Sequence, residues 1–257
     1  MGKRYNDTFG DRMKSYEAVT NVFLAKKIPV ILRFDMCHGH TYTRGFEKPF
    51  DNIMVITMQK TMKALCESIQ GTVFGYTQSD EISLVLVDYQ TLETSAWFDY
   101  RLEKICSIGA SMASRYFNKF FIETVTEEMN KPENINKKFD VYIKKFFSAD
   151  FDCRAFNIPK EDVCNNILWR QRDAEKNSIQ MLAQSLYSHK ELQGISRKNL
   201  QNKMFTEKGV NWNELPIPYK RGSACRKDEN GKWYIDCKMP ILSENRGYIE
   251  DLIYVGK

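Results

Sequence analysis

The order of strand-like and helix-like segments in residues 1–159 predicts an α+β fold. Three observations carry this prediction: a strand-like run precedes a helix-period segment, two strand-like runs form a hairpin, and a second helical segment precedes a fourth strand-like run. The order βα, ββ, αβ is that of a split β-α-β unit. We therefore expect a four-stranded antiparallel sheet with both helices on one face.

The first strand is predicted at 29–35 and the first helix at 50–68. Residues 29–35 are a short apolar run, β-branched near its start, that ends at a Gly/His-rich segment. Residues 50–68 carry apolar side chains at the spacing of one helix face, and Asp51 is a suitable N-cap. This βα pair begins the unit.

A hairpin and a second αβ pair complete the predicted sheet. The runs 72–77 and 82–88 are strand-like and lie four residues apart, which is hairpin spacing. A helix is predicted at 101–120, where small residues allow close packing, and a strand at 151–158. The charged, lysine-rich segment 124–147 is interpreted as an insertion.

The chain divides into two predicted regions. Residues 1–159 have the layout of ferredoxin-like domains and polymerase palms, so we predict a palm-like catalytic domain there. Residues 160–257 form a mixed C-terminal region that packs on the palm. It contains a helix at 161–186 and a β-hairpin around the D-E-N-G turn at 228–231.

Composition narrows the class of protein without fixing its function. The chain has 257 residues, 42% of them hydrophobic, and a net charge of +5, which permits an anionic partner. Seven scattered cysteines without a C-x-x-C motif argue against a disulfide framework or a structural zinc site. No apolar run is long enough for a membrane helix or a signal peptide. We expect a cytoplasmic protein with no membrane partner.

Two aspartates are candidates for a metal site. Asp35 ends the first strand and Asp80 lies in the central hairpin turn, positions that can lie side by side in a split β-α-β sheet. Carboxylates about 4 Å apart repel by roughly 4 kcal/mol at an effective dielectric of about 20, so such a pair shares a proton or binds a cation. Oxygen ligands select Mg²⁺ or Mn²⁺, and two such ions can assist an in-line phosphoryl displacement. The alternative is a polar turn with solvated charges.

Several motifs, in their order and spacing, resemble the tRNA-histidine guanylyltransferase family. They are R-F-D at 33–35 with His40, F-E-K-P-F-D at 46–51, G-Y-T-Q-S-D-E-I-S at 75–83, Lys104 before I-C-S, F-D-x-R-x-F at 151–156, W-R-Q-x-D at 169–173, N-S-I at 177–179 and K-R-G-S at 220–223. The resemblance covers about residues 15–250. Its N-S-I version is similar to the bacterial and archaeal guanylyltransferase-like branch, because the eukaryotic branch has a histidine where this chain has Glu175.

The resemblance implies a metal-dependent nucleotidyltransferase that extends the 5′ end of tRNA in the 3′–5′ direction. ATP or GTP would activate a 5′-monophosphate end, which the 3′-hydroxyl of an incoming NTP then attacks. The product would be a repaired tRNA or a guanylylated tRNA-His. Asp35, Asp80 and the main-chain carbonyl of Met36 would hold two Mg²⁺ or Mn²⁺ ions, with Glu81 beside them as a further catalytic residue. The family also implies a homo-oligomer, in the form of a tetramer.

The resemblance further implies nucleotide-binding residues. They are Asp35, Met36, Cys37, His38, Gly39, His40, Lys48, Asp51, Ser79, Asp80 and Lys104. The family loop D-G-R/K-x-F-H reads D-M-C-H-G-H here, so the chain lacks a cation at Cys37 and an aromatic ring at Gly39. This departure puts nucleotide affinity and selectivity in question while the metal ligands are kept. A zinc site at this loop would need further ligands that the sequence does not cluster there.

Six polar residues are candidates for RNA contacts. They are Arg33, Arg170, Lys176, Asn177, Lys220 and Arg221. Arg33 could instead form a surface ion pair, and the W-R-Q-x-D helix could simply dock on the palm through Trp169. The lysines at 131–145 could bind phosphates or belong to a solvated insertion.

Two other functions remain open from the sequence. A palm-related nucleotide cyclase or hydrolase would use the same metal chemistry without RNA. A noncatalytic RNA-binding protein would present aromatic side chains on an open sheet face.

Overall fold

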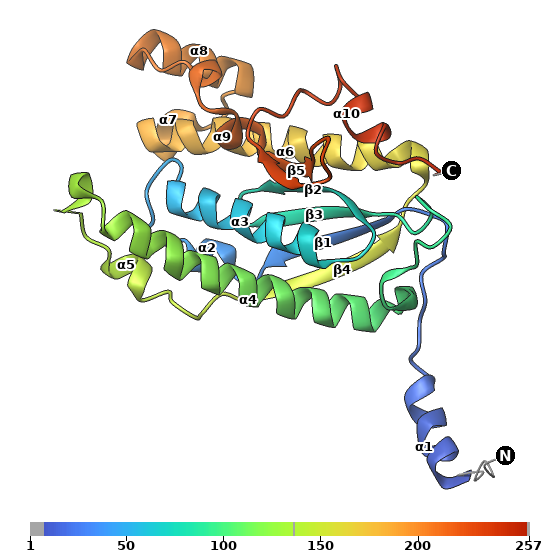
Figure 1. Ribbon diagram of the computed structural model, residues 1–257. Coiled ribbons are helices and arrows are strands. Elements are labelled where there is room, and N and C mark those ends of the chain that lie inside the picture. Colours follow the sequence, from blue (N-terminus) through green and yellow to red (C-terminus); the bar gives the residue numbers. More distant parts are fainter. Residues whose placement is uncertain (1–7, 136, 256–257) are drawn as a thin grey trace.

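A six-stranded antiparallel sheet with the order β4-β1-β3-β2-β5-β6 forms the centre of the molecule (Figure 1). The structure is a computed structural model that describes residues 8–135 and 137–255. The strands are β1 (Val30–Met36), β2 (Thr72–Gln78), β3 (Glu81–Leu86), β4 (Phe151–Asn157), β5 (Ser223–Lys227) and β6 (Trp233–Asp236). The first four form the predicted split unit, so the α+β, palm-like prediction is confirmed.

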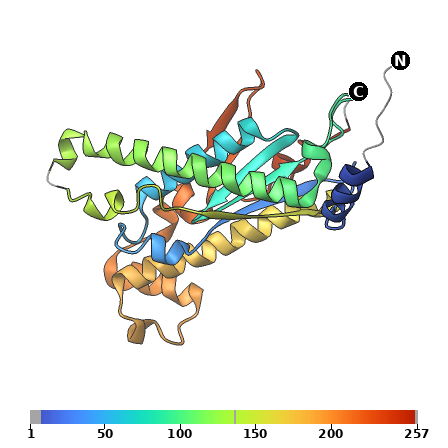
Figure 2. The ribbon, with the colours of Figure 1, turned by 90° about the horizontal axis from the view of Figure 1, so that it is seen from below.

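The longer helices pack in two layers around this sheet. The α-helices are α1 (Thr8–Ala18), α2 (Gly39–Tyr42), α3 (Asn52–Ser68), α4 (Leu102–Met129), α5 (Asp140–Ile143), α6 (Lys160–Leu186), α7 (His189–Leu192), α8 (Arg197–Lys208), α9 (Ile217–Arg221) and α10 (Gly247–Glu250). Short 3₁₀ turns lie at Trp97–Tyr100, Pro132–Asn134 and Trp212–Glu214. Helices α3 and α4 cover one face of the sheet and α6 covers the other (Figures 1 and 2).

The alternation of side chains along the strands separates the two cores. Leu32 and Phe34 point to the core under α3 and α4, whereas Ile31 points to the core under α6. Asp51 caps α3 as predicted, because its carboxylate accepts a hydrogen bond from the Met54 amide at 2.9 Å.

The predicted insertion at 124–147 is wrong in part. Helix α4 continues to Met129, beyond the predicted end at residue 120. Phe139 and Tyr142 are buried, and Tyr142 stacks on Phe46 with ring centroids 4.7 Å apart. The lysine-rich composition therefore conceals an aromatic contribution to the core. Lys138 and Lys144 are exposed, whereas the half-buried Lys145 donates to the Thr41 carbonyl at 3.1 Å.

The C-terminal hairpin is confirmed, and it also enlarges the sheet. Strand β5 pairs with β2 so that Ser223 lies opposite Thr77. Residues from both predicted regions therefore share one sheet, and the proposed boundary at 159/160 stays a prediction.

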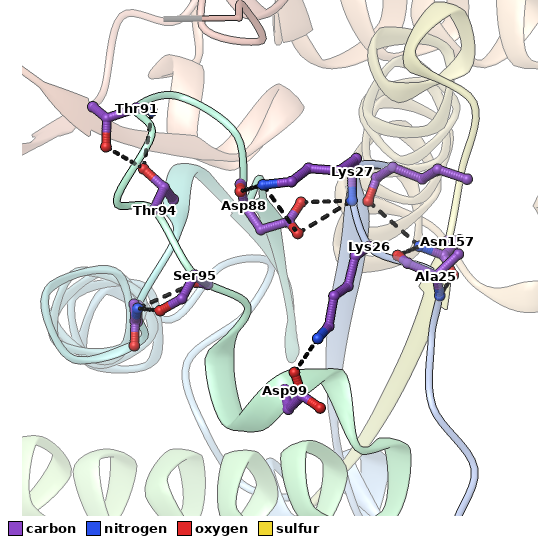
Figure 3. Close-up of polar contacts among 11 residues, drawn as sticks. Ala25, Lys26, Lys27, Asp88, Thr91, Thr94, Ser95, Asp99 and Asn157 are labelled. Carbon is purple, nitrogen blue, oxygen red and sulfur yellow. Dashed lines mark hydrogen bonds and ion pairs between the residues drawn. The ribbon is translucent and has the colours of Figure 1, made fainter.

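Polar contacts connect residues 25–27, just before β1, to neighbouring parts of the protein (Figure 3). The Lys27 amide donates to both carboxylate oxygens of the buried Asp88, at 2.9 and 3.1 Å, and Lys26 forms an ion pair with Asp99. The Asn157 side chain bonds to both main-chain groups of Ala25. By contrast, α1 buries none of its residues and projects away from the body (Figure 1). No helix in the described ranges is long and apolar enough to cross a membrane.

Candidate active site

The end of β1 and the β2–β3 turn bring Asp35 and Asp80 to the same edge of the sheet. Asp35 lies opposite Glu81 of β3 in the strand register. The Met36 amide donates a hydrogen bond to the Asp80 carbonyl at 3.1 Å. The split β-α-β order thus places two acids that are 45 positions apart beside each other, as the sequence predicts.

The electrostatics of Asp35 reflect this juxtaposition. Burial first, and then the charge of Asp80, raise the pKa of Asp35 above its ordinary value. Arg33 acts in the opposite direction, and Asp152 raises the pKa further. Arg154 also acts in the opposite direction, but burial and the two aspartates prevail, which favours binding of a proton or a cation at Asp35.

Asp152 is a further acid at this edge, besides Asp35, Asp80 and Glu81, and it is absent from the predicted site residues. It lies on β4 directly opposite Asp35, and its Oδ1 is buried with no hydrogen-bond partner among the described residues. The sequence contained a signal, since Asp152 is the second residue of the predicted fourth strand. Only the pairing of β4 with β1 places it next to Asp35.

Two arginines neutralise Glu81. Nη2 of Arg33 lies 2.9 Å from Glu81 Oε1 and 3.2 Å from Asp35 Oδ2. Arg170 forms an ion pair with the other carboxylate oxygen of Glu81. The side chains of Glu81 and Arg170 are 14% and 7% exposed. Both carboxylate oxygens of Glu81 are therefore paired with arginines, and Arg33 links Glu81 to Asp35; the catalytic role of Glu81 stays a prediction.

The loop after β1 accommodates Asp80 through a glycine. A Cβ atom on Gly39 would lie only 1.9 Å from Asp80 Oδ2, so the carboxylate rests against the main chain there. His38, just before the short α2, has a left-handed backbone with φ of 56°. Gly39 replaces the aromatic residue of the family loop, and its lack of a side chain leaves room for the Asp80 carboxylate.

The other predicted nucleotide-binding residues divide into two groups. The first group is exposed: Cys37 and His38 after β1, His40 in α2, Lys48 between α2 and α3, and Ser79 in the β2–β3 turn. Asp51 instead has an internal role, because its buried carboxylate also accepts bonds from the Glu47 amide at 2.9 Å and the Tyr142 hydroxyl at 2.6 Å.

The structure places Lys104 in the first turn of α4, and its role in nucleotide binding stays a prediction. Its ammonium lies over the Phe98 ring, 4.7 Å from the centroid, in the first turn of α4. That turn begins beside the segment before β1, since the Leu102 amide bonds to the Val22 carbonyl at 2.8 Å. The Phe151 amide, opposite Met36 in the β1–β4 register, bonds to the Ser114 hydroxyl further along α4.

Most of the side chains predicted to contact RNA instead form ion pairs or hydrogen bonds with other residues of the protein. Arg33 and Arg170 bind Glu81, and Arg221 pairs with Glu175 at 3.4 Å. Lys220 is buried and donates to the Asn213 carbonyl at 2.5 Å. Their partners lie on other helices and strands, so these contacts could not be predicted from the sequence alone.

The remaining residues of α6 that were singled out are exposed. Lys176 and Asn177 face solvent. Trp169 is 55% exposed, so the interpretation that α6 docks through this ring is wrong. Val163, Ile167 and Ala183 are buried on the inner side of α6 instead.

No group of three or more His, Cys, Asp or Glu side chains in the described residues could by itself hold a metal ion. Paired acids at the edge of a palm-like sheet suit phosphoryl-transfer chemistry.

Comparisons with known proteins give the family. The model of the tRNAHis guanylyltransferase family matches residues 10–159, and the chain belongs to this family. It is therefore a nucleotidyltransferase of the tRNA(His) guanylyltransferase type.

Two solved structures and one sequence relative illustrate the similarity. A bacterial tRNA(His) guanylyltransferase-like protein in complex with ATP is 41% identical, with a TM-score of 0.83 over 96% of this chain and 99% of that one. A bacterial guanylyltransferase-like protein in complex with GTP is 36% identical, with a TM-score of 0.75 over the same shares. Protein R259 of Acanthamoeba polyphaga mimivirus is 27% identical over 86% of this chain and 78% of its own length.

Proposed function

We propose that this protein adds nucleotides in the 3′–5′ direction to the 5′ end of tRNA and thereby repairs 5′-truncated tRNAs. The observation that carries the proposal is the juxtaposition of Asp35 and Asp80 in a member of this family. The similarity to bacterial guanylyltransferase-like proteins solved with ATP and GTP supports the use of both nucleotides.

The residues present fit Mg²⁺ or Mn²⁺. The donors at the edge of the sheet are hard carboxylate oxygens, and burial first, then the charge of Asp80, raise the pKa of Asp35, so a bound cation would favour its ionised form. Asp35, Asp80 and the main-chain carbonyl of Met36 would hold the ions, with substrate phosphates as the remaining ligands. When bound, such ions would supply charge stabilisation at the phosphoryl group under attack.

The side chains around these donors prepare the site. Arg33 donates a hydrogen bond to Oδ2 of Asp35 and another to Oε1 of Glu81. Arg170 on α6 binds the other oxygen of Glu81, on the sheet face toward which Arg33 and Asp35 also point. Gly39 leaves room for the Asp80 carboxylate. These contacts fix the two carboxylates before substrate enters, which lowers the cost of organising the site for the reaction.

The competing functions have less support. A noncatalytic RNA-binding sheet needs an open face with aromatic residues, yet both faces of this sheet are covered, by α3 and α4 and by α6. A nucleotide cyclase or hydrolase would leave the similarity to tRNA(His) guanylyltransferases unexplained.

The test uses purified protein, Mg²⁺, each NTP in turn and 5′-monophosphorylated tRNA that lacks its first nucleotides. We expect a ladder of template-directed products on a sequencing gel. Asp80→Asn should abolish it, whereas Glu250→Gln, in an exposed ion pair of α10, should not. A single guanosine added to tRNA-His alone would assign guanylylation instead of repair. NTP turnover without RNA, or RNA binding without addition, would overturn the proposal.

A further inference from the structure

A groove of about 390 Å³ lies between α6 and α8, outside the candidate active site. Four cationic side chains line it: Arg172, Lys176, Arg197 and Lys198. The amides of Gln201 and Asn202 complete its polar wall. We call this feature the α6–α8 groove.

The α6–α8 groove carries unbalanced positive charge. Its acidic lining residue, Glu175, already pairs with Arg221 from α9. Among the described residues, no carboxylate lies within ion-pair distance of the four cations. The packing of Ile179 on α6 against Leu200 and Met204 on α8 holds the two rows of cations together. An anion in the groove would relieve their mutual repulsion.

An exposed aromatic ring extends the same surface toward the active site. Trp169, Arg172 and Lys176 are spaced i, i+3 and i+7, so they share one stripe of α6 that is about 10 Å long. Trp169 is 55% exposed, and the Arg170 guanidinium lies 4.7 Å from its ring centroid. Arg170 in turn binds Glu81 beside Asp35. The stripe therefore connects the groove to the residues that organise the site.

The position of α8 agrees with this connection. Figures 1 and 2 place α8 beside the second half of α6, at the end of the sheet where β1 ends and α2 begins. A ligand in the groove would thus lie at the same end of the molecule as Asp35, on the outer side of α6.

We propose that the α6–α8 groove and Trp169 bind the RNA substrate by its phosphate backbone, with one base stacked on the indole. Flexible cations on an exposed surface suit phosphodiester oxygens and read no sequence, which fits an enzyme acting on many tRNAs. An exposed indole offers a sequence-tolerant stacking surface. This inference rests on the proposed function, because it supplies the contact that holds the RNA while its 5′ end reaches Asp35.

The test measures RNA binding without any nucleotide addition, so it is independent of the proposed activity. A fluorescent 5′-truncated tRNA transcript is titrated with protein over a series of NaCl concentrations. Lys176→Glu/Arg197→Glu should weaken binding and reduce the log–log salt slope by about 1.4 for single-stranded or 1.8 for duplex contacts. Trp169→Ala should weaken binding by about 5- to 150-fold if one base stacks there.

The matched control is Lys63→Glu/Lys119→Glu, an equal charge reversal on α3 and α4, across the sheet from α6. We expect it to keep the wild-type affinity and salt slope. All variants are checked for an unchanged melting temperature. Should the groove variant unfold, Lys198→Gln and Trp169→Leu provide the same comparison with smaller changes.

Two results would overturn the inference. One is a groove variant whose RNA affinity and salt slope equal those of the control. The other is that inorganic tripolyphosphate or ATP displaces RNA from the groove and that the groove variant loses affinity for ATP. That result would assign the groove to the nucleotide instead of the RNA. If the groove variant loses RNA while wild-type protein adds no nucleotides, the groove stands and the proposed function fails.

Discussion

Replacement of Glu81 by glutamine tests whether a buried ion-pair network organises the candidate active site. Glutamine keeps the shape of the side chain but removes the charge that Arg33 and Arg170 share. Both Glu81 and Arg170 are largely withdrawn from solvent, with exposed fractions of 14% and 7%. Removal of one partner from a buried ion pair costs about 3–5 kcal/mol, because the other charge stays buried without compensation.

The measurement is thermal unfolding of the two proteins in the same buffer. For a chain of this size, about 3 kcal/mol corresponds to a fall of roughly 6–12 °C in melting temperature. The control is Glu250→Gln, which removes an equal charge from a pair with Arg246 in which both side chains are about 40% exposed. Exposed pairs contribute at most about 1 kcal/mol, so its melting temperature should change by a few degrees or less.

A double variant separates the charge effect from a packing effect. In Glu81→Gln/Arg170→Met the unpaired cation on α6 is also removed, so the double variant should lose less stability than the sum of the two single changes. The reasoning is refuted if Glu81→Gln melts within experimental error of Glu250→Gln. Additive losses in the double variant would equally show that Glu81 and Arg170 do not act as a pair.

Three further outcomes are expected at the same site. Asp35→Asn should stabilise the metal-free protein at pH 7, because burial and the charge of Asp80 raise the pKa of Asp35 in the folded state. This gain in stability should vanish below the ordinary pKa of 3.8, where the carboxyl is protonated in both the folded and the unfolded protein. A gain in stability that grows on acidification would contradict the prediction. Mg²⁺ at ten times its dissociation constant should stabilise the wild type by about 1.4 kcal/mol, and an equal rise in melting temperature for Asp80→Asn would place the ion elsewhere. Gly39→Ala should displace the Asp80 carboxylate, because the added Cβ would lie 1.9 Å from Oδ2, and should lower the single-turnover rate of nucleotide addition with little change in melting temperature. A wild-type rate would show that the position of this carboxylate does not limit the reaction.

The covered second face of the sheet bears on how the RNA is held. In an RNA-binding sheet of the open type, bases stack directly on the strands. Here α6 occupies that face, and its exposed side carries Trp169 and the cations of the α6–α8 groove. The helix thus replaces the strands as the surface available to a nucleic acid.

The sequence by itself determined the split β-α-β unit and the positions of Asp35 and Asp80 in it. Strand and helix periodicities are local, so they can be read without knowledge of distant contacts. Once the order βα, ββ, αβ is recognised, the connections leave few possible sheets, and the end of the first strand meets the central hairpin turn in the expected one.

Only the tertiary structure decided how the charged residues are used. Arg33 and Arg170 resemble free phosphate ligands in the sequence, but both bind Glu81, which lies 48 and 89 positions away from them. The place of Lys104 at the start of α4, where the Leu102 amide bonds to the Val22 carbonyl, depends on the direction of this helix. The α6–α8 groove likewise forms only when two helices pack together. A charge acquires its role from its partners, and those partners are brought together by packing between elements that no local pattern records.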